Sequence, residues 1–302
     1  MSAVAPQSRI QFVYDFAALD RVPEGPTSVR VAAKRLLSGP SLKTGKSSTV
    51  GAVLSGSHII CTLGTQSQGS GAKPHTHPNE QFNYILQGTM TGDIEGDRVF
   101  APKASILHTP GMAVHTGLAC PEEDLVFLAI KDTRHGIVGP PVDGKYDGPN
   151  YLPGFGTRAH EPKQSTAAMM AEAKRHPGPG KRYVYDMSDA ADAHAGPASA
   201  AVTPGAGLAL PDGIRGKLLT GELLHVGVLR FAPGAAIAEH VHDNEQFAFV
   251  VEGGLEAELA GQTLRVDECC LLHVPPGMPH ALTAPRGALV VIAQDNRFAY
   301  SA

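Results

Sequence analysis

The chain has 302 residues, which is enough for two domains of ordinary size, each with its own hydrophobic core. Its 25 basic and 29 acidic residues give a net charge of −4 without any basic run, so we expect no nucleic-acid partner. No stretch approaches about 18 consecutive apolar residues, and the first residues lack the features of a secretory signal, so the sequence predicts a cytoplasmic protein without membrane contact.

The first 47 residues form a predicted N-terminal arm (residues 1–47). Within it, residues 10–16, IQFVYDF, predict a strand, and residues 181–187, KRYVYDM, repeat this strand later in the chain. Tyr14 then corresponds to Tyr185, at an offset of 185 − 14 = 171. A repeat of this kind indicates that the chain contains two related halves.

From residue 48 to about residue 139, short apolar runs alternate with Gly, Pro, Asn and Asp. Even spacing of short strands with turn residues between them is typical of an antiparallel barrel or sandwich. Residues 95–97 and 260–262 occupy the same place in the two halves and predict hairpin tips. We therefore expect an N-terminal β domain over residues 48–139.

Residues 69–88, GSGAKPHTHPNEQFNYILQG, contain three possible metal ligands. Because side chains alternate between the two faces of a strand, His75, His77 and Gln81 point the same way if the strand is unbroken. His115 follows a predicted strand and turn, so a neighbouring strand can bring it into the same cavity. The sequence thus predicts a metal site made of three histidines and one glutamine.

Residues 140–180 are rich in Pro and Gly and form a predicted connector. They include residues 164–176, QSTAAMMAEAKRH, which are helical by composition and are followed by Pro177 and Gly178. We place the domain junction here, so that the C-terminal domain spans residues 181–302.

The C-terminal half repeats the predicted metal site. Residues 234–253, GAAIAEHVHDNEQFAFVVEG, align with residues 69–88 at an offset of 240 − 75 = 165, without an insertion. The same offset relates His115 to His280. The second set of candidate ligands is His240, His242, Gln246 and His280. A chance scatter of histidines would not repeat at one offset, so the repeat is a whole domain.

These residues resemble the two sequence motifs of the cupin superfamily, and their duplication resembles a bicupin. The first motif is matched at Gly69, His75, His77, Gln81 and Gly88 and at Gly234, His240, His242, Gln246 and Gly253, with Gln at the usual Glu position in both copies. The second motif keeps its Pro to His spacing, but Ala104 and Cys269 replace its opening Gly. The resemblance implies an all-β fold of two tandem cupin barrels, which are double-stranded β-helices or jelly rolls, with a short connecting helix.

Three imidazoles and one amide bring no negative charge to a divalent cation, so such a metal favours an anionic or chelating substrate. These ligands suit Fe, Mn, Ni, Co or Zn, and the resemblance favours Fe(II). Gln81 and Gln246 either bind the ion or hydrogen-bond a metal-bound water. Glu80 and Glu245 have the opposite strand parity and are expected to form outward ion pairs or hydrogen bonds, unless a bulge exchanges Glu and Gln.

Two further histidines, His108 and His273, repeat at the same offset of 165. They are candidate catalytic acids or bases, because imidazole titrates near neutral pH. The alternative is a strand histidine that is hydrogen-bonded in the barrel wall. The four cysteines show no CxxC spacing and are expected to be reduced.

The resemblance implies a metal-dependent enzyme, and the reaction that it favours is oxygen-dependent cleavage of an aromatic or other chelating anion. Gentisate dioxygenase-like and quercetin dioxygenase-like bicupins are the models for this reaction. One alternative is an isomerase, lyase or decarboxylase that acts on a sugar acid or keto acid, and another is a pirin-like regulatory binding protein. Cupins commonly associate through sheet edges and terminal strands, so we expect a homodimer or larger homo-oligomer in which residues 1–47 contribute to the contact.

Overall fold

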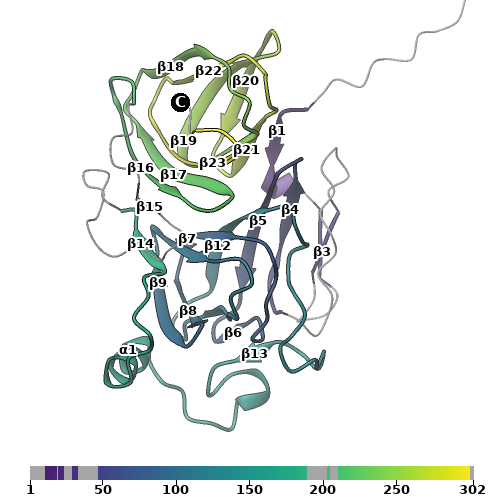
Figure 1. The fold of residues 1–302 in the computed structure, drawn as a ribbon, viewed down its shortest axis with the longest axis vertical. Helices are drawn as coiled ribbons and strands as arrows, with labels where there is room; N and C mark the ends of the chain where they lie inside the picture. The colour runs from purple at the N-terminus through teal and green to yellow at the C-terminus, as the bar shows by residue number, and fades with distance from the viewer. Residues whose placement is uncertain are drawn as a thin grey trace, which may run out of the picture.

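The computed structural model describes residues 11–18, 20–23, 29–32, 47–188, 203–204 and 210–299. Its described residues form mainly antiparallel strands, with one α-helix, α1 (Thr166–Arg175), in the predicted connector. Figure 1 shows two barrels stacked end to end, the N-terminal one in purple to teal and the C-terminal one in green to yellow. The predicted all-β fold of two tandem jelly rolls with a connecting helix is confirmed. Most of the predicted arm, residues 1–47, lies outside the described residues.

The N-terminal barrel consists of two antiparallel sheets that pack on each other through Ile85, Leu107 and Phe127 from one sheet and Met90 and Val99 from the other. The six-stranded sheet has the order β14 (Val184–Asp186), β10 (Ser105–Thr109), β7 (Gln81–Gln87), β12 (Leu125–Asp132), β5 (Ile59–Gln66) and β4 (Val50–Ser55). The five-stranded sheet has the order β13 (Asn150–Tyr151), β6 (Ser70–Gly71), β11 (Leu118–Ala119), β8 (Thr89–Ile94) and β9 (Asp97–Pro102).

The C-terminal barrel repeats this arrangement in one continuous sheet of ten strands. Its main order is β1 (Val13–Asp15), β21 (Cys270–Val274), β19 (Gln246–Leu259), β23 (Ala288–Asp295), β17 (Leu224–Phe231), β16 (Ile214–Thr220) and β15 (Thr203–Pro204). The remaining strands, β18 (Ala235–His240), β20 (Gln262–Asp267) and β22 (His280–Ala284), close the barrel by pairing with one another or with β19. A separate hairpin is formed by β2 (Asp20–Pro23) and β3 (Val29–Ala32), and two short 3-10 helices span Phe16–Ala18 and Gly156–Arg158.

The two halves exchange one strand each. Strand β1 precedes the N-terminal barrel in the chain but pairs with β21 of the C-terminal barrel, where Tyr14 lies opposite Leu271. Strand β14 precedes the C-terminal barrel but pairs with β10 of the N-terminal barrel, where Tyr185 lies opposite Ile106. Residues 184–186 therefore complete the N-terminal sheet, although the repeat pattern assigned them to the C-terminal domain.

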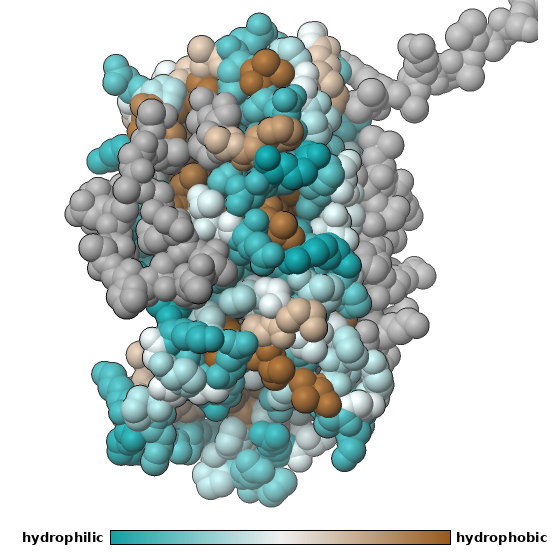
Figure 2. All heavy atoms as spheres, viewed as in Figure 1, coloured by the Kyte–Doolittle hydropathy of each residue, from teal (hydrophilic) through white to brown (hydrophobic). Residues whose placement is uncertain are grey.

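One hydrophobic core cluster joins the two barrels. It combines Leu54, Ile59 and Phe82 of the N-terminal half with Phe247 and Phe249 of the C-terminal half, all essentially inaccessible to solvent. The face shown in Figure 2 is largely hydrophilic with scattered apolar residues, as expected when most large apolar side chains lie inside. The barrels are therefore held together by exchanged strands and by a continuous apolar contact.

Both predicted hairpin tips are present. Strands β8 and β9 are joined by Glu95 and Gly96, and β19 and β20 by Ala260 and Gly261, with positive φ at all four residues. Positive φ at both central residues is the requirement of a tight type I′ hairpin turn. All four cysteines are free, and two of them, Cys61 and Cys120, are buried.

Candidate metal centres

The N-terminal triad of His75, His77 and His115 lies on loops beside the barrel strands. The prediction of one unbroken strand from His75 to Gln81 is wrong, because β6 ends at Gly71 and β7 begins at Gln81. Pro74 and Pro78 lie in this gap, and proline has no N–H to donate to a strand ladder. His75 and His115 are instead joined by reciprocal backbone hydrogen bonds of 3.0 Å.

The C-terminal triad of His240, His242 and His280 has a similar origin. His240 is the last residue of β18 and pairs with His280, the first residue of β22. His242 follows two residues after the end of β18. Two strand ends and the short loop between β18 and β19 thus bring the three imidazoles together.

The two triads have almost the same geometry. In the N-terminal triad the ring centroids of His75 and His115 are 4.2 Å apart, and those of His77 and His115 are 4.8 Å apart. The corresponding distances in the C-terminal triad, to His280, are 4.2 Å and 4.9 Å. In each triad the candidate ligand atoms lie within 4.8 Å of one another, so each can close around one ion.

Backbone carbonyl groups orient all six imidazoles. In the N-terminal triad, Nδ1 donates to the carbonyl oxygen two residues away, at 2.7 Å for His75, 3.2 Å for His77 and 2.9 Å for His115. In the C-terminal triad the same contacts are 3.0 Å for His240, 2.9 Å for His242 and 3.0 Å for His280. A carbonyl can only accept, so Nδ1 carries the proton and the lone pair remains on Nε2, which is the arrangement of a metal-binding histidine.

The C-terminal triad fits a divalent metal ion. The Nε2 atoms of His240, His242 and His280 are buried, and none has a hydrogen-bond partner among the described residues. Buried polar atoms are nearly always paired, because leaving them without a partner is costly. Three buried, converging lone pairs are the donor set that an ion such as Zn(II) or Fe(II) would satisfy.

Burial also keeps these imidazoles in the neutral form. Burial, with further contributions from Lys131 and His115, lowers the pKa of His77 to about 2. Burial lowers the pKa of His115 to about 4 and that of His280 to about 4. Only the neutral imidazole binds a metal, so the site is ready for an ion at neutral pH.

The predicted fourth ligands, Gln81 and Gln246, are each tied to another side chain. The amide nitrogen of Gln81 donates to Oδ1 of Asn83 at 2.8 Å, and Gln81 lines one cavity with His75 and His115. The amide oxygen of Gln246 accepts from Gln294 at 2.6 Å. Their role as ligands stays a prediction.

Lys131 is a residue of the N-terminal centre that the sequence reasoning did not identify. Its side chain is buried on β12, and its ammonium nitrogen lies 3.0 Å from Nε2 of His77 and donates to the carbonyl of Ile137 at 2.5 Å. Burial lowers the pKa of Lys131 to about 7, against a smaller opposing effect of Asp132. A lysine within the apolar run LVFLAIKD was the available signal, because lysine is almost never fully buried without a partner.

The two predicted catalytic histidines do not lie with the triads. His108 is fully buried and its Nε2 lies 2.9 Å from a carboxylate oxygen of Glu80, and His273 makes the same contact with Glu245 at 2.9 Å. These are the wall hydrogen bonds that were the alternative interpretation. The catalytic role of His108 and His273 stays a prediction, since their visible role is to hold a carboxylate.

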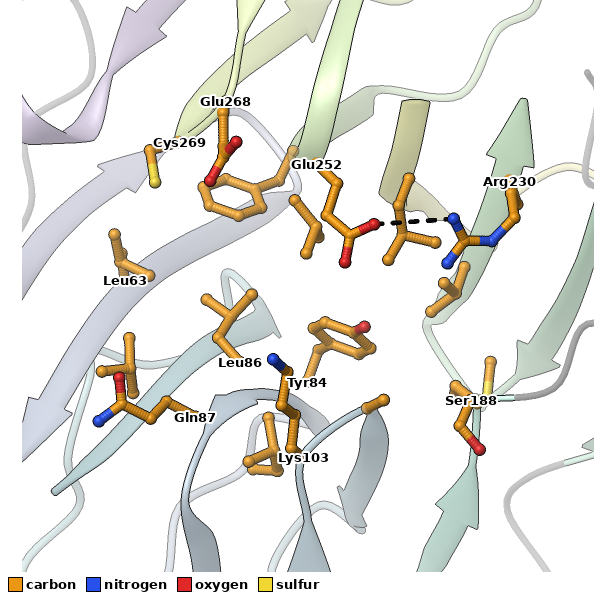
Figure 3. A pocket seen from close by; sticks show the side chains of 18 of the residues that line it. Leu63, Tyr84, Leu86, Gln87, Lys103, Ser188, Arg230, Glu252, Glu268 and Cys269 are labelled. Atoms are coloured by element: carbon orange, nitrogen blue, oxygen red, sulfur yellow. Dashed lines mark ion pairs between the residues drawn. The ribbon is translucent and has the colours of Figure 1, made fainter. Parts of the chain in front are cut away.

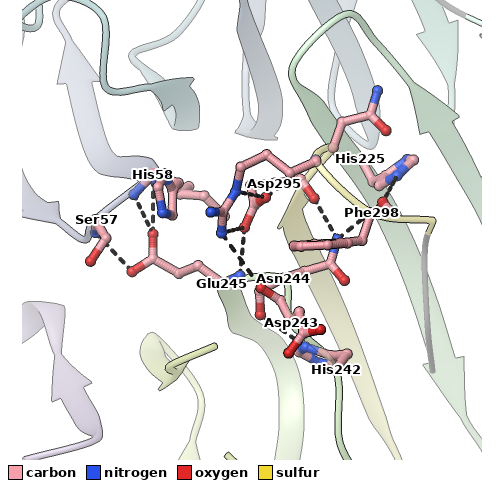
Figure 4. Close-up of polar contacts among 12 residues, drawn as sticks. Ser57, His58, His225, His242, Asp243, Asn244, Glu245, Asp295 and Phe298 are labelled. Atoms are coloured by element: carbon pink, nitrogen blue, oxygen red, sulfur yellow. Dashed lines mark hydrogen bonds and ion pairs between the residues drawn. The ribbon is translucent and has the colours of Figure 1, made fainter. Parts of the chain in front are cut away.

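Glu80 and Glu245 each cross from one domain to the other, and we call these contacts the two carboxylate latches. The carboxylate of Glu245 accepts hydrogen bonds from the backbone N–H groups of Ser57 at 2.8 Å, His58 at 2.6 Å and Ile59 at 3.0 Å (Figure 4). All three donors belong to the N-terminal domain. The parity argument, which placed this glutamate away from the metal site, agrees with its position.

The second latch is the mirror of the first. Glu80 of the N-terminal domain accepts from the N–H groups of Glu222 at 2.9 Å, Leu223 at 2.8 Å and Leu224 at 3.2 Å in the C-terminal domain. Each carboxylate packs on a glycine, so that a Cβ on Gly221 would lie only 2.1 Å from Oε1 of Glu80. Glycine is required there because of this close approach.

A larger cleft, of about 430 Å³, lies between the two domains and away from the histidines (Figure 3). Tyr84 and Lys103 of one domain face Arg230, Glu252 and Glu268 of the other across it. None of the six triad histidines lines this cleft. The cleft between the domains and the histidine triads are therefore separate features of the molecule. The part of the chain that the structure describes holds no helix with the length and apolarity to cross a bilayer.

Comparison with solved structures shows the same two-domain architecture in distant proteins. AerE from Microcystis aeruginosa aligns with a TM-score of 0.57 at 10% identity, over 93% of this chain and 98% of that one. Oxalate decarboxylase from Bacillus subtilis, a protein with Mn(II) centres, aligns with a TM-score of 0.57 at 14% identity, over 97% of this chain and 79% of that one. Salicylate 1,2-dioxygenase from Pseudoaminobacter salicylatoxidans, solved with gentisate, aligns with a TM-score of 0.51 at 14% identity, over 79% of this chain and 69% of that one.

A search of curated protein sequences finds no match. The model of the cupin domain, in contrast, matches the chain twice, over residues 62–131 and 227–293. Each match spans one histidine triad. The chain is therefore a bicupin, a member of the cupin superfamily with one cupin domain in each half.

Proposed function

We propose that this bicupin is a metal-dependent enzyme whose catalytic centre is the N-terminal triad, and that it acts on a small carboxylate as an isomerase, lyase or decarboxylase. The observation that supports this choice is a difference between the two barrel interiors. Beside the N-terminal triad lies a cavity whose lining includes hydroxyl and amide side chains, whereas the matching positions of the C-terminal barrel are apolar and packed.

Four positions show the difference. At the offset of 165, the cavity-lining residues Thr49, Gln66, Asn83 and Thr109 become Ile214, Phe231, Ala248 and Val274 in the C-terminal barrel. All four of the C-terminal residues belong to its buried hydrophobic core. A packed core has no room for a substrate, while hydroxyl and amide groups around a cavity bind a polar one.

The cavity favours a small substrate. Its volume is about 60 Å³, which is room for only a few water-sized groups. That is the size of a carboxylic acid with about as many non-hydrogen atoms, such as a short keto acid. Hydroxybenzoic acids, in comparison, have ten or more non-hydrogen atoms.

The lining also matches a hydrogen-bonding anion. Lys131 supplies an amine that donates hydrogen bonds and, when protonated, carries a positive charge, and the amide oxygen of Gln66 is buried with no hydrogen-bond partner among the described residues. An amide oxygen in this state accepts a hydrogen bond from a hydroxyl group of the ligand or from water. The substrate class is therefore a small carboxylate with a hydroxyl group that can donate to Gln66, or with a keto oxygen that the metal would polarise.

A divalent metal held by His75, His77 and His115 would act as a Lewis acid that polarises an oxygen of the substrate. The chain supplies the remaining functions around it: the neutral imidazoles hold the ion, Asn83 and Thr109 orient the substrate, and the barrel excludes bulk water. We favour Fe(II) as the ion, with Mn, Ni, Co and Zn as alternatives of the same ligand preference.

A dioxygenase remains the second candidate. Its support is the uncharged ligand set, which leaves the ion cationic and open to a chelating anion. An aromatic substrate would need a wider cavity than the one beside the N-terminal triad. Oxygen dependence separates the two functions, because only the dioxygenase consumes dioxygen.

The test is turnover of purified protein with a panel of small keto acids, sugar acids and hydroxybenzoates, in air and without oxygen, after elemental analysis of the metal. We expect oxygen-independent turnover of a small carboxylate that is lost in His75→Ala and retained in His240→Ala. The matched variant Asn83→Ala with Thr109→Val, which installs the C-terminal residues, should lose kcat/KM without losing metal. Activity that survives His75→Ala but not His240→Ala would refute the assignment to the N-terminal triad.

A further inference from the structure

The two triads differ at one neighbouring strand position. Lys131 of β12 and Gln294 of β23 occupy the same place in the two barrels, since Lys131 lies opposite Gln81 and Gln294 lies opposite Gln246. The N-terminal triad therefore has an amine against it, and the C-terminal triad has a neutral amide.

The amine uses the lone pair that a metal would need. Nδ1 of His77 donates to Asn79, so Nε2 is the acceptor, and the ammonium group of Lys131 reaches it at 3.0 Å. The corresponding Nε2 atom of His242 has no hydrogen-bond partner among the described residues. Gln294 instead donates to Gln246 at 2.6 Å.

We propose that Lys131 controls metal loading of the N-terminal centre, so that a metal binds there only when Lys131 leaves His77, and the C-terminal centre loads first. A divalent cation bound at Nε2 of His77 and the protonated amine of Lys131 would repel each other, because charges interact more strongly inside a protein than in water. Binding of the ion must also break the contact between Lys131 and His77. Both effects lower the affinity of the N-terminal centre, and neither acts in the C-terminal one.

This inference rests on the metal-binding role proposed above. It adds the order in which the two centres bind metal, and it names Lys131 as the residue that sets this order. The amine also donates to the carbonyl of Ile137 and lines the cavity, so after leaving His77 it would stay there beside the substrate. In that position Lys131 faces the carboxylate of a substrate. The negative charge of the substrate is then balanced by the ion and by Lys131 only when the centre holds its metal.

The experiment is titration of the metal-free full chain with Co(II), followed by calorimetry and by visible absorption. Two backgrounds separate the sites: His240→Ala with His242→Ala reports the N-terminal centre, and His75→Ala with His77→Ala reports the C-terminal centre. We expect the N-terminal centre to bind at least about tenfold more weakly than the C-terminal one.

The reciprocal exchange of the two residues tests the cause. Lys131→Gln should raise the affinity of the N-terminal centre at least about tenfold, and Gln294→Lys should lower that of the C-terminal centre by a similar factor. Lys131→Met, which keeps an unbranched apolar side chain without the amine, should act like Lys131→Gln, and circular dichroism checks that each variant is folded.

An unchanged N-terminal affinity in both Lys131 variants would overturn the inference. A reduced affinity would also overturn it, since it would make Lys131 a ligand. If neither centre of the otherwise unchanged chain binds Co(II), the proposed metal-dependent function fails as well, and this result is distinct from the other two.

Discussion

The carboxylate latches predict a large loss of stability when one of them is altered. In Glu245→Gln, an amide nitrogen, which can only donate, replaces one of the two accepting oxygens. In one orientation of the amide this nitrogen faces the N–H groups of His58 and Ile59, and in the other it faces Ser57 and His273. Hydrogen bonds to a charged group each contribute about 1.5–3 kcal/mol. Because such contributions are not additive, we expect a loss of about 3–5 kcal/mol, the usual cost of breaking a buried charged pair.

Urea denaturation followed by circular dichroism measures this loss. The control is Glu252→Gln on the same strand, where the carboxylate is exposed and lies 3.6 Å from Arg230. An exposed pair of this kind contributes less than about 1 kcal/mol. If Glu245→Gln cost no more than Glu252→Gln, the latch would not hold the two domains together and the reasoning would be refuted.

Three further predictions concern the same interface and the repeated motifs. Gly221→Ala should cost about 1–3 kcal/mol in urea denaturation, because its Cβ would lie 2.1 Å from Oε1 of Glu80, and a neutral effect would show that this hairpin can move away. Ala104→Gly and Cys269→Gly should each raise stability slightly, because both residues have a φ of 62°. Glycine relieves about 1–2 kcal/mol of left-handed strain, which outweighs its entropy cost of roughly 0.5–1 kcal/mol. A lower melting temperature of either variant would contradict this. Asp295→Asn should lose stability at neutral pH but not in acid. Burial alone raises the pKa of Asp295, but hydrogen bonds from the Arg297 side chain and from the N–H groups of Glu245 and Arg297 lower it by more, so that the pKa lies below its ordinary value. Its stabilisation is present above the unfolded pKa of about 3.9 and is lost as the pH falls through the folded value, so a stability difference that persists in full at about pH 3 would refute the assignment.

Much of the fold and of the ligand set could be predicted from local patterns. The six triad histidines were found from two spacings that repeat at one offset, and Glu80 and Glu245 were placed away from the metal by strand parity. Both signals are local, because ligand spacing and the alternation of side chains act within a few residues. The error at Pro74 and Pro78 was also local: proline ended the strand before the ligands, and a strand ladder was assumed to continue through it.

The features that distinguish the two halves depended on the tertiary structure. Lys131 comes 54 residues after His77 in the chain, yet its amine reaches that imidazole, and Glu245 accepts from N–H groups almost 190 residues away. The exchange of β1 and β14 likewise joins each barrel to a segment that precedes the other one. The sequence by itself therefore determined the duplicated barrel and its ligands, while the domain contacts, the cavity beside the N-terminal triad and the position of Lys131 were decided by the register between distant strands, which no local spacing encodes.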